Sequence, residues 1–480
     1  MKLEMRFATK GDCKILWEWR NDEETRKMAF SSDFIPYEAH KNWFTKSLRD
    51  LSRKILIIQD SGEKTGMVRF DIEKNEATIN INIAPDKRGK GYGTSSLVES
   101  CKYAFENFCI TKIIALIKPE NIASVRAFEK AGFSFVDRNE IRMVLYSPGG
   151  KGIFSRIVDT ARKEKMRIAF PEADEESVLK AVEKIVREKI AFPVLIGNEQ
   201  KIFKKFEHLG IDINPSSYDI IDPEKEQRFA NRLFEIRKEK GLTLEEAKKL
   251  VKNPVYFSAM VLESGEVDGV ISGAVVGTAE SIRPFLQTIK TEEGIKKVSS
   301  SFIMYTDSKT YIFADCSIIV DPNPEELAGI AVATSETAKW LGISPRVAML
   351  SFSTKGSAIH PFVDKVAVAT ELLKKQNPEI TVEGEIQVDA AIVPDVARKK
   401  ATSIIQGDAN VLIFPDLNSG NIAYKLVERL GGYTAIGPII QGLSKPINVL
   451  SRGCSVDDIF LMTALTVVQA QHKKNRKVTP

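Results

Sequence analysis

The runs Ile168-Ala169-Phe170 and Phe192-Pro193-Val194-Leu195-Ile196 decide the fold of the larger part of this chain. Each is a short apolar segment, and a helical stretch separates the two. The same alternation returns around Val347–Leu350 and Val411–Phe414. Short apolar strands that alternate with helices predict βα units around a largely parallel sheet.

The residues before this region follow a different pattern. Lys54–Ile58 and Ala77–Ile83 are expected to be strands, and Ser95–Phe108 is expected to be a helix, which predicts an α+β domain. The stretch Ser147-Pro148-Gly149-Gly150-Lys151-Gly152 has no apolar period and is rich in glycine and proline. We therefore expect a first domain over residues 1–147, a linker over 148–152 and a second domain over 153–480.

Length and composition agree with two globular domains. The chain has 480 residues, whereas a single core stops growing near about 250 to 300 residues. Its content of 43% hydrophobic and 28% charged residues is that of an ordinary soluble protein. It contains no apolar run of about 18 residues and its start lacks the apolar region of a signal peptide. These features predict a cytoplasmic protein without a membrane partner.

The charged and sulfur-bearing residues exclude several kinds of partner. The net charge of +5 is small, and no basic stripe with interleaved aromatic residues is present, so no nucleic-acid partner is expected. The five cysteines have no CxxC spacing, which argues against a disulfide framework and a zinc site. We therefore predict no bound metal. Small polyanionic ligands remain compatible with the charge.

A glycine-rich segment, Arg88-Gly89-Lys90-Gly91-Tyr92-Gly93, follows one predicted strand and precedes the predicted helix. Glycines allow a backbone to approach an anion closely, and the first N–H groups of a helix favour a pyrophosphate. The alternative is a glycine-rich turn that binds no ligand.

This segment and the downstream run Asn121–Phe133 together resemble the GNAT acetyltransferase family. The resemblance implies an acetyl-CoA-dependent N-acetyltransferase that acts on an amine. It also implies that coenzyme A is bound by the residues Arg88, Gly89, Gly91, Gly93 and Asn121. Many family members have a tyrosine where this chain has Phe128, so the group that protonates the leaving thiolate stays unassigned.

The aromatic residues near the start leave the amine acceptor open. The segments Trp17–Asn21 and His40–Phe44 are similar to the GNAT branch that acetylates nucleotide-linked sugars or protein N-termini. The alternative is that Trp17, Trp19 and Trp43 are ordinary core residues.

Ordered sequence blocks across the second predicted domain resemble phosphotransacetylase, a phosphate acetyl/butyryltransferase. The blocks are Arg167–Ala173, Asp268–Ala274, Ile282–Pro284, Phe313–Cys316, Ser351–Ser357, Phe414–Asn421 and Leu450–Gly453. The resemblance implies a two-lobed α/β domain with an architecture like that of isocitrate and isopropylmalate dehydrogenases. It further implies a homodimer that interconverts acetyl-CoA and phosphate with coenzyme A and acetyl phosphate, as in acetate metabolism. The whole chain would then be bifunctional.

Such a reaction needs a base, an oxyanion donor and fixed cations. A thiol with a pKa near 8.5 must lose its proton to attack an acyl phosphate, and arginine suits phosphoryl oxygens best. The resemblance assigns the base to Asp458, the donor to Ser451 and phosphate binding to Arg452. It also places Arg237 and Arg283 near coenzyme A or phosphate.

Alternatives remain for these residues and for the activity. Ser455-Val456-Asp457-Asp458 is also a helix capping box, and Ser451-Arg452 could be a polar turn before that helix. The acyl group could be butyryl, because a pocket discriminates one methylene by only about 1 to 3 kcal/mol. The domain could instead be a non-catalytic acetyl-CoA sensor, although Ser451, Arg452 and Asp458 are all present.

Overall fold

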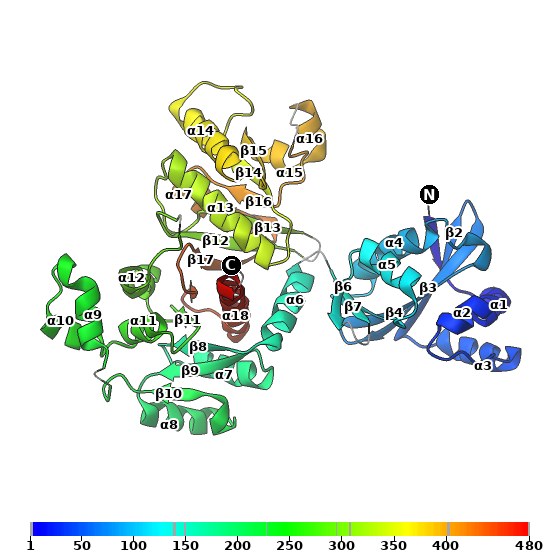
Figure 1. Cartoon of the computed structure of the whole chain (residues 1–480), viewed down its shortest axis with the longest axis horizontal. Helices are drawn as coiled ribbons and strands as arrows, with labels where there is room; N and C mark the ends of the chain where they lie inside the picture. Colours follow the sequence, from blue (N-terminus) through cyan, green and yellow to red (C-terminus); the bar gives the residue numbers. More distant parts are fainter. Residues whose placement is uncertain are drawn as a thin grey trace. The chain divides into compact units, whose positions relative to one another are not determined.

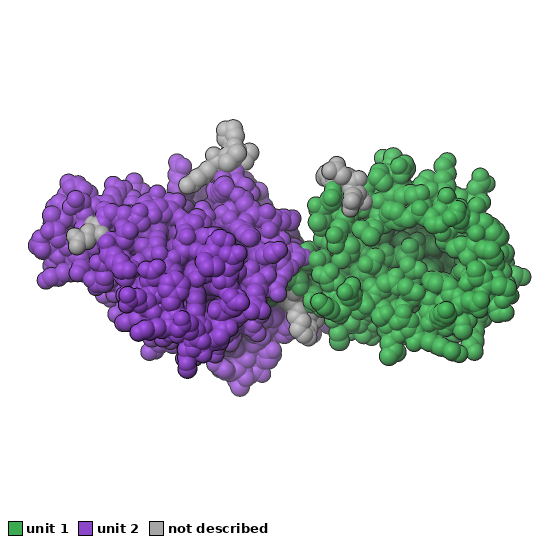
Figure 2. Space-filling model, turned by 90° about the horizontal axis from the view of Figure 1, so that it is seen from below, with its two compact units in different colours: residues 1–155 green, residues 156–480 purple. Residues whose placement is uncertain are grey.

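A computed structural model describes residues 3–137, 141–147, 150–226, 228–293, 295–306, 309–400 and 404–478. The chain forms two compact units, Met1–Ser155 and Arg156–Pro480 (Figures 1 and 2). Each unit has its own sheet.

Unit 1 is an α+β structure. Its helices are α1 (Cys13–Asn21), α2 (Glu23–Met28), α3 (Tyr37–Ser47), α4 (Tyr92–Asn107) and α5 (Ile122–Lys130). Its strands are β1 (Leu3–Phe7), β2 (Arg53–Asp60), β3 (Glu63–Glu73), β4 (Glu76–Ile83), β5 (Lys112–Leu116), β6 (Ser134–Asp137) and β7 (Arg142–Tyr146), which form one sheet in the order β1-β2-β3-β4-β5-β7-β6.

Two neighbouring strands of this sheet separate part-way along their length. β4 and β5 pair in parallel, with Glu76 opposite Lys112 and Thr78 opposite Ile114. β4 then continues to Ile83, where it still pairs with β3 but has no registered partner in β5. The backbone of β4 beyond Thr78 is therefore open on the β5 side, next to the loop that leads into α4.

Alternation of side chains along these strands builds two apolar layers. Leu56, Val68 and Phe70 belong to a core that also contains Leu97 of α4 and Phe128 of α5. The intervening residues of the strands pack with α1 and α3 in a second cluster, made of Cys13, Leu16, Trp19, Phe44, Ile55, Ile57, Met67 and Ala84. Helices thus use both faces of the sheet, as the period of two in a strand requires.

Unit 2 consists of helices around one large sheet. After α6 (Gly150–Lys163), its helices are α7 (Glu176–Arg187), α8 (Glu199–Leu209), α9 (Ala230–Arg237), α10 (Leu244–Leu250), α11 (Pro254–Ser264), α12 (Thr278–Thr288), α13 (Pro324–Trp340), α14 (Pro361–Gln376), α15 (Val388–Ile392), α16 (Pro394–Lys399), α17 (Leu417–Gly431) and α18 (Val456–Val478). Its strands are β8 (Met166–Phe170), β9 (Ala191–Ile196), β10 (Asp219–Ile221), β11 (Gly269–Ser272), β12 (Ser299–Tyr305), β13 (Thr310–Ala314), β14 (Arg346–Leu350), β15 (Thr381–Ile386), β16 (Val411–Ile413), β17 (Thr434–Gln441) and β18 (Ile447–Val449).

The sheet of unit 2 has eleven strands in the order β10-β9-β8-β11-β18-β17-β12-β13-β16-β14-β15. The strands from β10 to β18 run parallel to one another, as do β13, β16, β14 and β15. Antiparallel pairing through β17 and β12 joins the two groups. The predicted βα alternation and largely parallel sheet are confirmed, with an antiparallel centre that the sequence pattern did not indicate.

The predicted elements agree with the structure except at the start of one helix and near the domain boundary. The expected helix Ser95–Phe108 begins earlier, at Tyr92, because Gly91 takes a left-handed conformation with φ +86° and ends the preceding loop there. Helix α6 begins at Gly150, so residues 150–152 are helical where we expected a linker. Residues 148 and 149 lie outside the described residues.

The described helices and the cysteines were also compared with what a membrane span and a disulfide require. None of their helices is long and apolar enough to cross a membrane. All five cysteines are free, and three of them, Cys13, Cys101 and Cys316, are buried.

Candidate active site

Three loops of unit 2 leave neighbouring parallel strands at the same edge of the sheet. They follow β8, β11 and β18, which are adjacent in the sheet order. Because the strands are parallel, their carboxyl ends meet at one edge, the usual place for a ligand in an α/β sheet. The loops interlock, since the Leu450 amide donates to Ser272 O at 2.7 Å. They contain or lead to Glu172, Arg283, Ser451, Arg452 and Asp458.

Glu172, in the loop after β8, holds the loop after β11 through its buried carboxylate. Its Oε2 accepts the amides of Gly273 and Ala274 at 2.7 and 2.8 Å. Its Oε1 accepts the amides of Val275 and Val276, both at 3.0 Å. Four consecutive N–H groups therefore converge on one anion, which neutralises the partial positive charge of this backbone nest.

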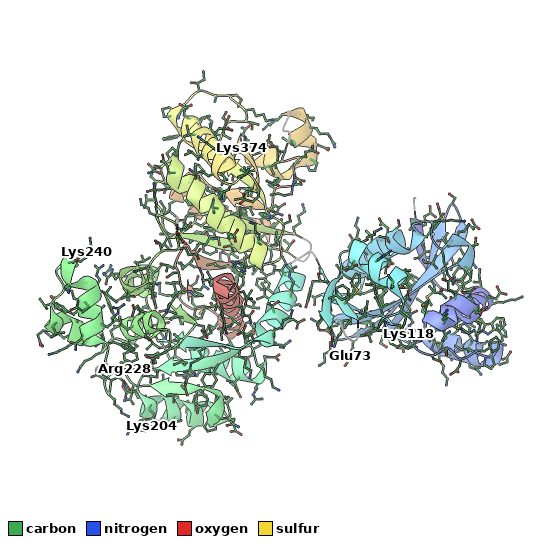
Figure 3. The ribbon with its side chains drawn as sticks, viewed as in Figure 1. Glu73, Lys118, Lys204, Arg228, Lys240 and Lys374 are labelled. Atoms are coloured by element: carbon green, nitrogen blue, oxygen red, sulfur yellow. The ribbon has the colours of Figure 1, made fainter. Side chains whose placement is uncertain are left out.

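Ser451 and Arg452 lie in the loop between β18 and α18. Both are exposed, and the turn is closed by the Cys454 amide, which donates to Ser451 O at 3.1 Å. Arg283 is exposed on α12, and Arg237 is the last residue of α9. Helix α12 packs against both α9 and β18, so these elements are neighbours. Lys240, labelled in Figure 3, marks the turn that follows Arg237.

Three arginines of unit 2 differ from the others in their surroundings. Most arginines here are held by carboxylates or backbone carbonyls, such as Arg167 by Asp219 and Arg346 by Asp408. Among those whose side chains the structure describes, Arg237, Arg283 and Arg452 have no ion pair or hydrogen bond. The arginine predicted to bind phosphate, Arg452, and the two predicted near coenzyme A or phosphate, Arg237 and Arg283, are therefore free to form charge-assisted hydrogen bonds with an anion.

Asp458 forms the capping box that the sequence offered as an alternative. Its Oδ2 accepts the amide and the hydroxyl of Ser455 at 2.9 and 2.8 Å, and Ser455 Oγ accepts the Asp458 amide at 3.1 Å. Within the described residues, Oδ1 has no hydrogen-bond partner, and the residue is exposed. The cap therefore occupies one carboxylate oxygen and leaves the other available.

Cys454, in the loop between β18 and α18, is partly buried. Burial raises the pKa of its thiol to about 11, with further contributions from the charges of Asp458 and Glu172. Both carboxylates, although they come from segments far apart in the sequence, favour the neutral form of this thiol.

The glycine-rich loop of unit 1 lies at the beginning of α4, beside the open part of β4. Gly89 and Gly91 have φ of +73° and +86°, a region that favours glycine. Gly93 lies in the first turn of α4, and a Cβ there would contact only Ile83, at 4.0 Å. The backbone of this loop is therefore open to the close approach of a ligand.

Arg88 and Asn121 use their side chains locally. Arg88 donates to Asp22 at 2.7 Å, to Glu24 at 3.1 Å and to Thr25 at 2.6 Å, which ties the glycine-rich loop to α2. Asn121 caps α5 by accepting the Ser124 amide at 3.1 Å. Both side chains therefore have structural roles. Their predicted contacts with coenzyme A stay predictions.

The aromatic residues of unit 1 have mostly core roles. Phe128 is buried and packs edge to face on Phe133, with ring centroids 4.8 Å apart. Because its ring carries no hydroxyl group, it cannot protonate a leaving thiolate. Trp19 is buried and Trp43 packs against the same cluster. Trp17 is partly exposed and donates its indole N–H to Ile35 O at 2.7 Å.

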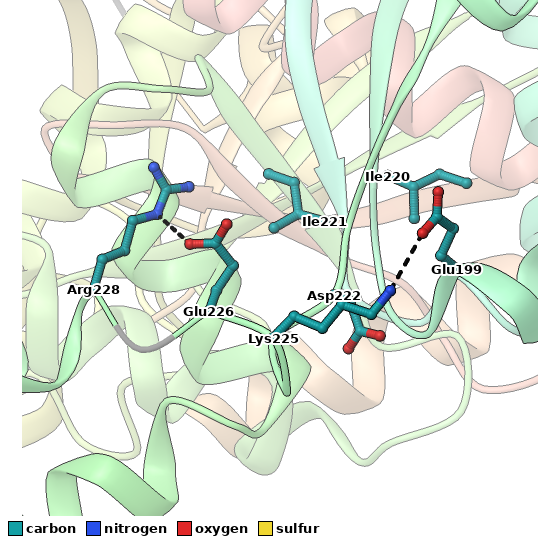
Figure 4. A pocket seen from close by; sticks show the side chains of 7 residues that line it. All are labelled: Glu199, Ile220, Ile221, Asp222, Lys225, Glu226 and Arg228. Carbon is teal, nitrogen blue, oxygen red and sulfur yellow. Dashed lines mark hydrogen bonds and ion pairs between the residues drawn. The ribbon is translucent and has the colours of Figure 1, made fainter.

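A separate surface pocket of about 220 Å³ lies at the end of β10 (Figure 4). Its cations already have partners, because Lys225 pairs with Glu199 at 3.4 Å and Arg228 with Glu226 at 3.1 Å. Unlike the three arginines described above, these side chains neutralise one another. The pocket therefore has no uncommitted cation that would attract a phosphate.

Two family models match the chain. The model described as phosphate acetyl/butaryl transferase covers residues 152–467, and that of the GNAT acetyltransferase domain covers residues 2–134. The chain belongs to the phosphate acetyl/butaryl transferase family. It carries a GNAT domain in addition, and it is an acyltransferase whose two domains both fit acetyl-CoA as a substrate.

Known members of this transferase family are similar over the whole of unit 2. A phosphate acetyltransferase from Thermoanaerobacterium thermosaccharolyticum is 49% identical and aligns over 66% of this chain and 99% of its own length. One from Bacillus subtilis is 45% identical, with 66% and 99% covered. The crystal structure of a phosphotransacetylase from Streptococcus pyogenes has a TM-score of 0.65 at 43% identity and covers 67% of this chain and 99% of that one.

Sequence reasoning about this transferase missed the role of Glu172. The residue was visible as the first of several carboxylates after a buried strand, yet its amide partners lie about a hundred residues further along the chain. No group of three or more potential metal ligands occurs in the part of the chain that the structure describes.

Proposed function

We propose that unit 2 transfers an acetyl group between coenzyme A and inorganic phosphate, with acetyl phosphate as the other acyl compound. The observation that carries this proposal is the set of three arginines without partners, Arg237, Arg283 and Arg452, on neighbouring elements. Relatives named phosphate acetyltransferase, 45% to 49% identical over nearly their full length, support the acetyl group over butyryl.

The proposed chemistry follows from the residues at the ends of β11 and β18. Oδ1 of Asp458 takes the proton of the coenzyme A thiol, and the thiolate attacks the acetyl carbon of acetyl phosphate. Ser451 donates to the carbonyl oxygen as it becomes an oxyanion. The new C–S bond forms as the C–O bond to phosphate breaks, and Arg452 holds the departing phosphate, with Arg237 and Arg283 binding coenzyme A or phosphate.

The test is an assay of thioester absorbance with the purified chain, coenzyme A and acetyl phosphate. Loss of a general base costs about 10²-fold to 10⁴-fold in rate, so Asp458→Asn should lose at least a hundredfold in kcat. Asp457→Asn is the matched control, because Asp457 is an exposed neighbour that pairs with Lys184. Absence of turnover in the parent would favour an acetyl-CoA sensor, and faster turnover of butyryl phosphate would favour the butyryl alternative.

Unit 1 is proposed to be an N-acetyltransferase with its own coenzyme A site. The amides at the start of α4 would bind the pyrophosphate, with Gly89, Gly91 and Gly93 allowing its approach and Arg88 and Asn121 at the edges of the site. The open edge of β4 beyond Thr78 would receive the pantetheine arm through backbone hydrogen bonds. A test is release of free coenzyme A from acetyl-CoA with a panel of amines, using Asp458→Asn to silence unit 2. No release with any amine would count against it.

A homodimer through unit 2 is proposed from an apolar stripe on α17. Ile422, Leu426 and Leu430 follow one another at helical spacing and are 55%, 51% and 82% exposed. Three exposed aliphatic side chains in a row are costly on a free surface. Light scattering should give twice the chain mass for the parent and for Lys425→Glu, and the monomer mass for Leu426→Glu. A monomeric parent would contradict the proposal.

A further inference from the structure

Glu172 has an arrangement that its neighbours do not share. Its carboxylate is 9% exposed and accepts four backbone amides, yet no cation pairs with it in the described residues. A buried carboxylate without a cation is costly unless hydrogen bonds replace its water. Here both oxygens are satisfied by one loop, so the position of the carboxylate and the shape of that loop determine each other.

The loop that Glu172 holds leads directly to the proposed catalytic groups. Gly273 has φ of +99°, and a Cβ there would lie 2.8 Å from Val449 Cγ1 and 2.9 Å from Leu450 O. The loop is therefore pressed against the segment that precedes Ser451. In the other direction it ends at Gly277, the N-cap of α12, the helix that carries Arg283.

Four convergent amides also form a binding site for an anion in their own right. In an enzyme that binds phosphate at the same sheet edge, an empty nest would attract the substrate to an unproductive position. The carboxylate of Glu172 fills this nest permanently. A carboxylate of the protein itself thus occupies the position where a substrate phosphate would otherwise bind.

We propose that Glu172 is a positioning residue for acyl transfer in unit 2, which fills the nest of Gly273–Val276 and thereby sets the Ser451-Arg452 loop and Arg283. This inference rests on the proposed function and deepens it. In this role Glu172 contacts neither the thiol of coenzyme A nor the acyl group. It acts through the two segments that its loop braces.

The decisive variant is Glu172→Gln, with Glu176→Gln as the matched control. Glutamine keeps the size of the side chain but presents an NH₂ group to two of the four amides. A displacement of about 1 Å at a catalytic group can cost roughly a hundredfold, so we expect a loss of ten- to a hundredfold in kcat/KM for acetyl phosphate. Glu176 is exposed on the next helix, and its variant should keep the parental rate.

A second variant separates positioning from general stability. Glu172→Gly empties the nest. Formate should raise the activity of this variant at least tenfold, because it returns a carboxylate to the four amides. Formamide, which has the same size without the charge, should not. Restoration by both compounds or by neither would overturn the proposal.

The thiol of Cys454 gives a readout that does not depend on turnover. Glu172 contributes to its raised pKa, so Glu172→Gln should accelerate alkylation of Cys454 at pH 9, followed by peptide mass spectrometry. If Glu172→Gln does not fold, Glu172→Asp replaces it, since it keeps the charge but withdraws the oxygens from the nest. Parental kinetics in either folded variant would overturn the proposal, whereas an inactive parent would overturn only the proposed function.

Discussion

Asp458 Oδ2 accepts both the amide and the hydroxyl of Ser455, at 2.9 and 2.8 Å, while its other oxygen has no partner in the described part of the chain. A capping role and a catalytic role are therefore compatible in one carboxylate. The two roles can be separated, because Ser455 takes part only in the cap.

Replacement of Ser455 should affect stability more than catalysis. Ser455→Ala removes the side chain that accepts the Asp458 amide, and loss of such a cap costs about 1 kcal/mol. We expect a decrease of that size in the free energy of unfolding of unit 2, measured with urea, and a kcat within about threefold of the parent. A loss of kcat as large as that of Asp458→Asn would mean that the cap itself holds the base in place.

Alkylation of Cys454 should depend steeply on pH. With a pKa raised to about 11 by burial and the nearby carboxylates, the reactive thiolate grows about tenfold per pH unit below that value. The rate constant with iodoacetamide should therefore rise about a hundredfold between pH 8 and pH 10. Asp458→Asn removes one of these charges and should increase the rate at pH 9, whereas Asp457→Asn should not.

The sequence was sufficient for the elements and insufficient for the contacts between loops. Strands such as Val347–Leu350 were predictable because burial on both faces leaves an unbroken apolar run. The capping box at Ser455 was predictable because its partners are three residues apart. The hydrogen bond from the Gly273 amide to Glu172 was not predictable, because no local pattern indicates which distant amides a carboxylate will accept. The antiparallel centre of the sheet was unpredictable for the same reason, since the partner of each strand is set by the topology of the whole sheet.

Asp12 should make the stability of unit 1 sensitive to acid. Its buried carboxylate pairs with Arg6 and Lys64, each at 2.8 Å, and these partners hold its pKa well below the usual range. The folded state therefore binds the proton less readily than the unfolded state, whose pKa is near 3.9. The stabilisation is complete above about pH 4 and is lost as the pH falls below it.

The corresponding variant makes this a measurable difference. Asp12→Asn leaves two cations without their shared partner, and breaking a buried pair costs about 3 kcal/mol. Unit 1 of the variant should unfold at lower urea concentration at pH 7, and its deficit relative to the parent should shrink as the pH is lowered from 4 to 2. A deficit that is constant with pH would show that charge is not its cause.

The glycines of the α4 loop should differ in what they tolerate. Gly91→Ala forces a residue with a side chain to adopt φ of +86°, which costs about 1 to 2 kcal/mol. Gly93→Ala has room for its Cβ and gains helix propensity, by up to about 1 kcal/mol. Thermal unfolding of unit 1 should therefore shift down for Gly91→Ala and stay or rise for Gly93→Ala. If the loop binds pyrophosphate, both variants should lose coenzyme A affinity in unit 1 while the phosphate acetyltransferase rate is unchanged.

Gly273 and Gly277 offer the sharpest contrast in unit 2, because they begin and end the same loop. An alanine Cβ at Gly273 would meet Val449 and Leu450 within 3 Å at a positive φ, whereas one at Gly277 has nothing within 4 Å. Strain and overpacking together should cost Gly273→Ala about 2 to 4 kcal/mol, whereas Gly277→Ala, which puts a poorer N-cap residue on α12, should lose about 0.5 to 1 kcal/mol. Because Leu450 directly precedes Ser451, kcat should also fall at least tenfold for Gly273→Ala. Equal kinetics in the two variants would mean that the contact between this loop and Leu450 has no influence on the proposed catalytic groups.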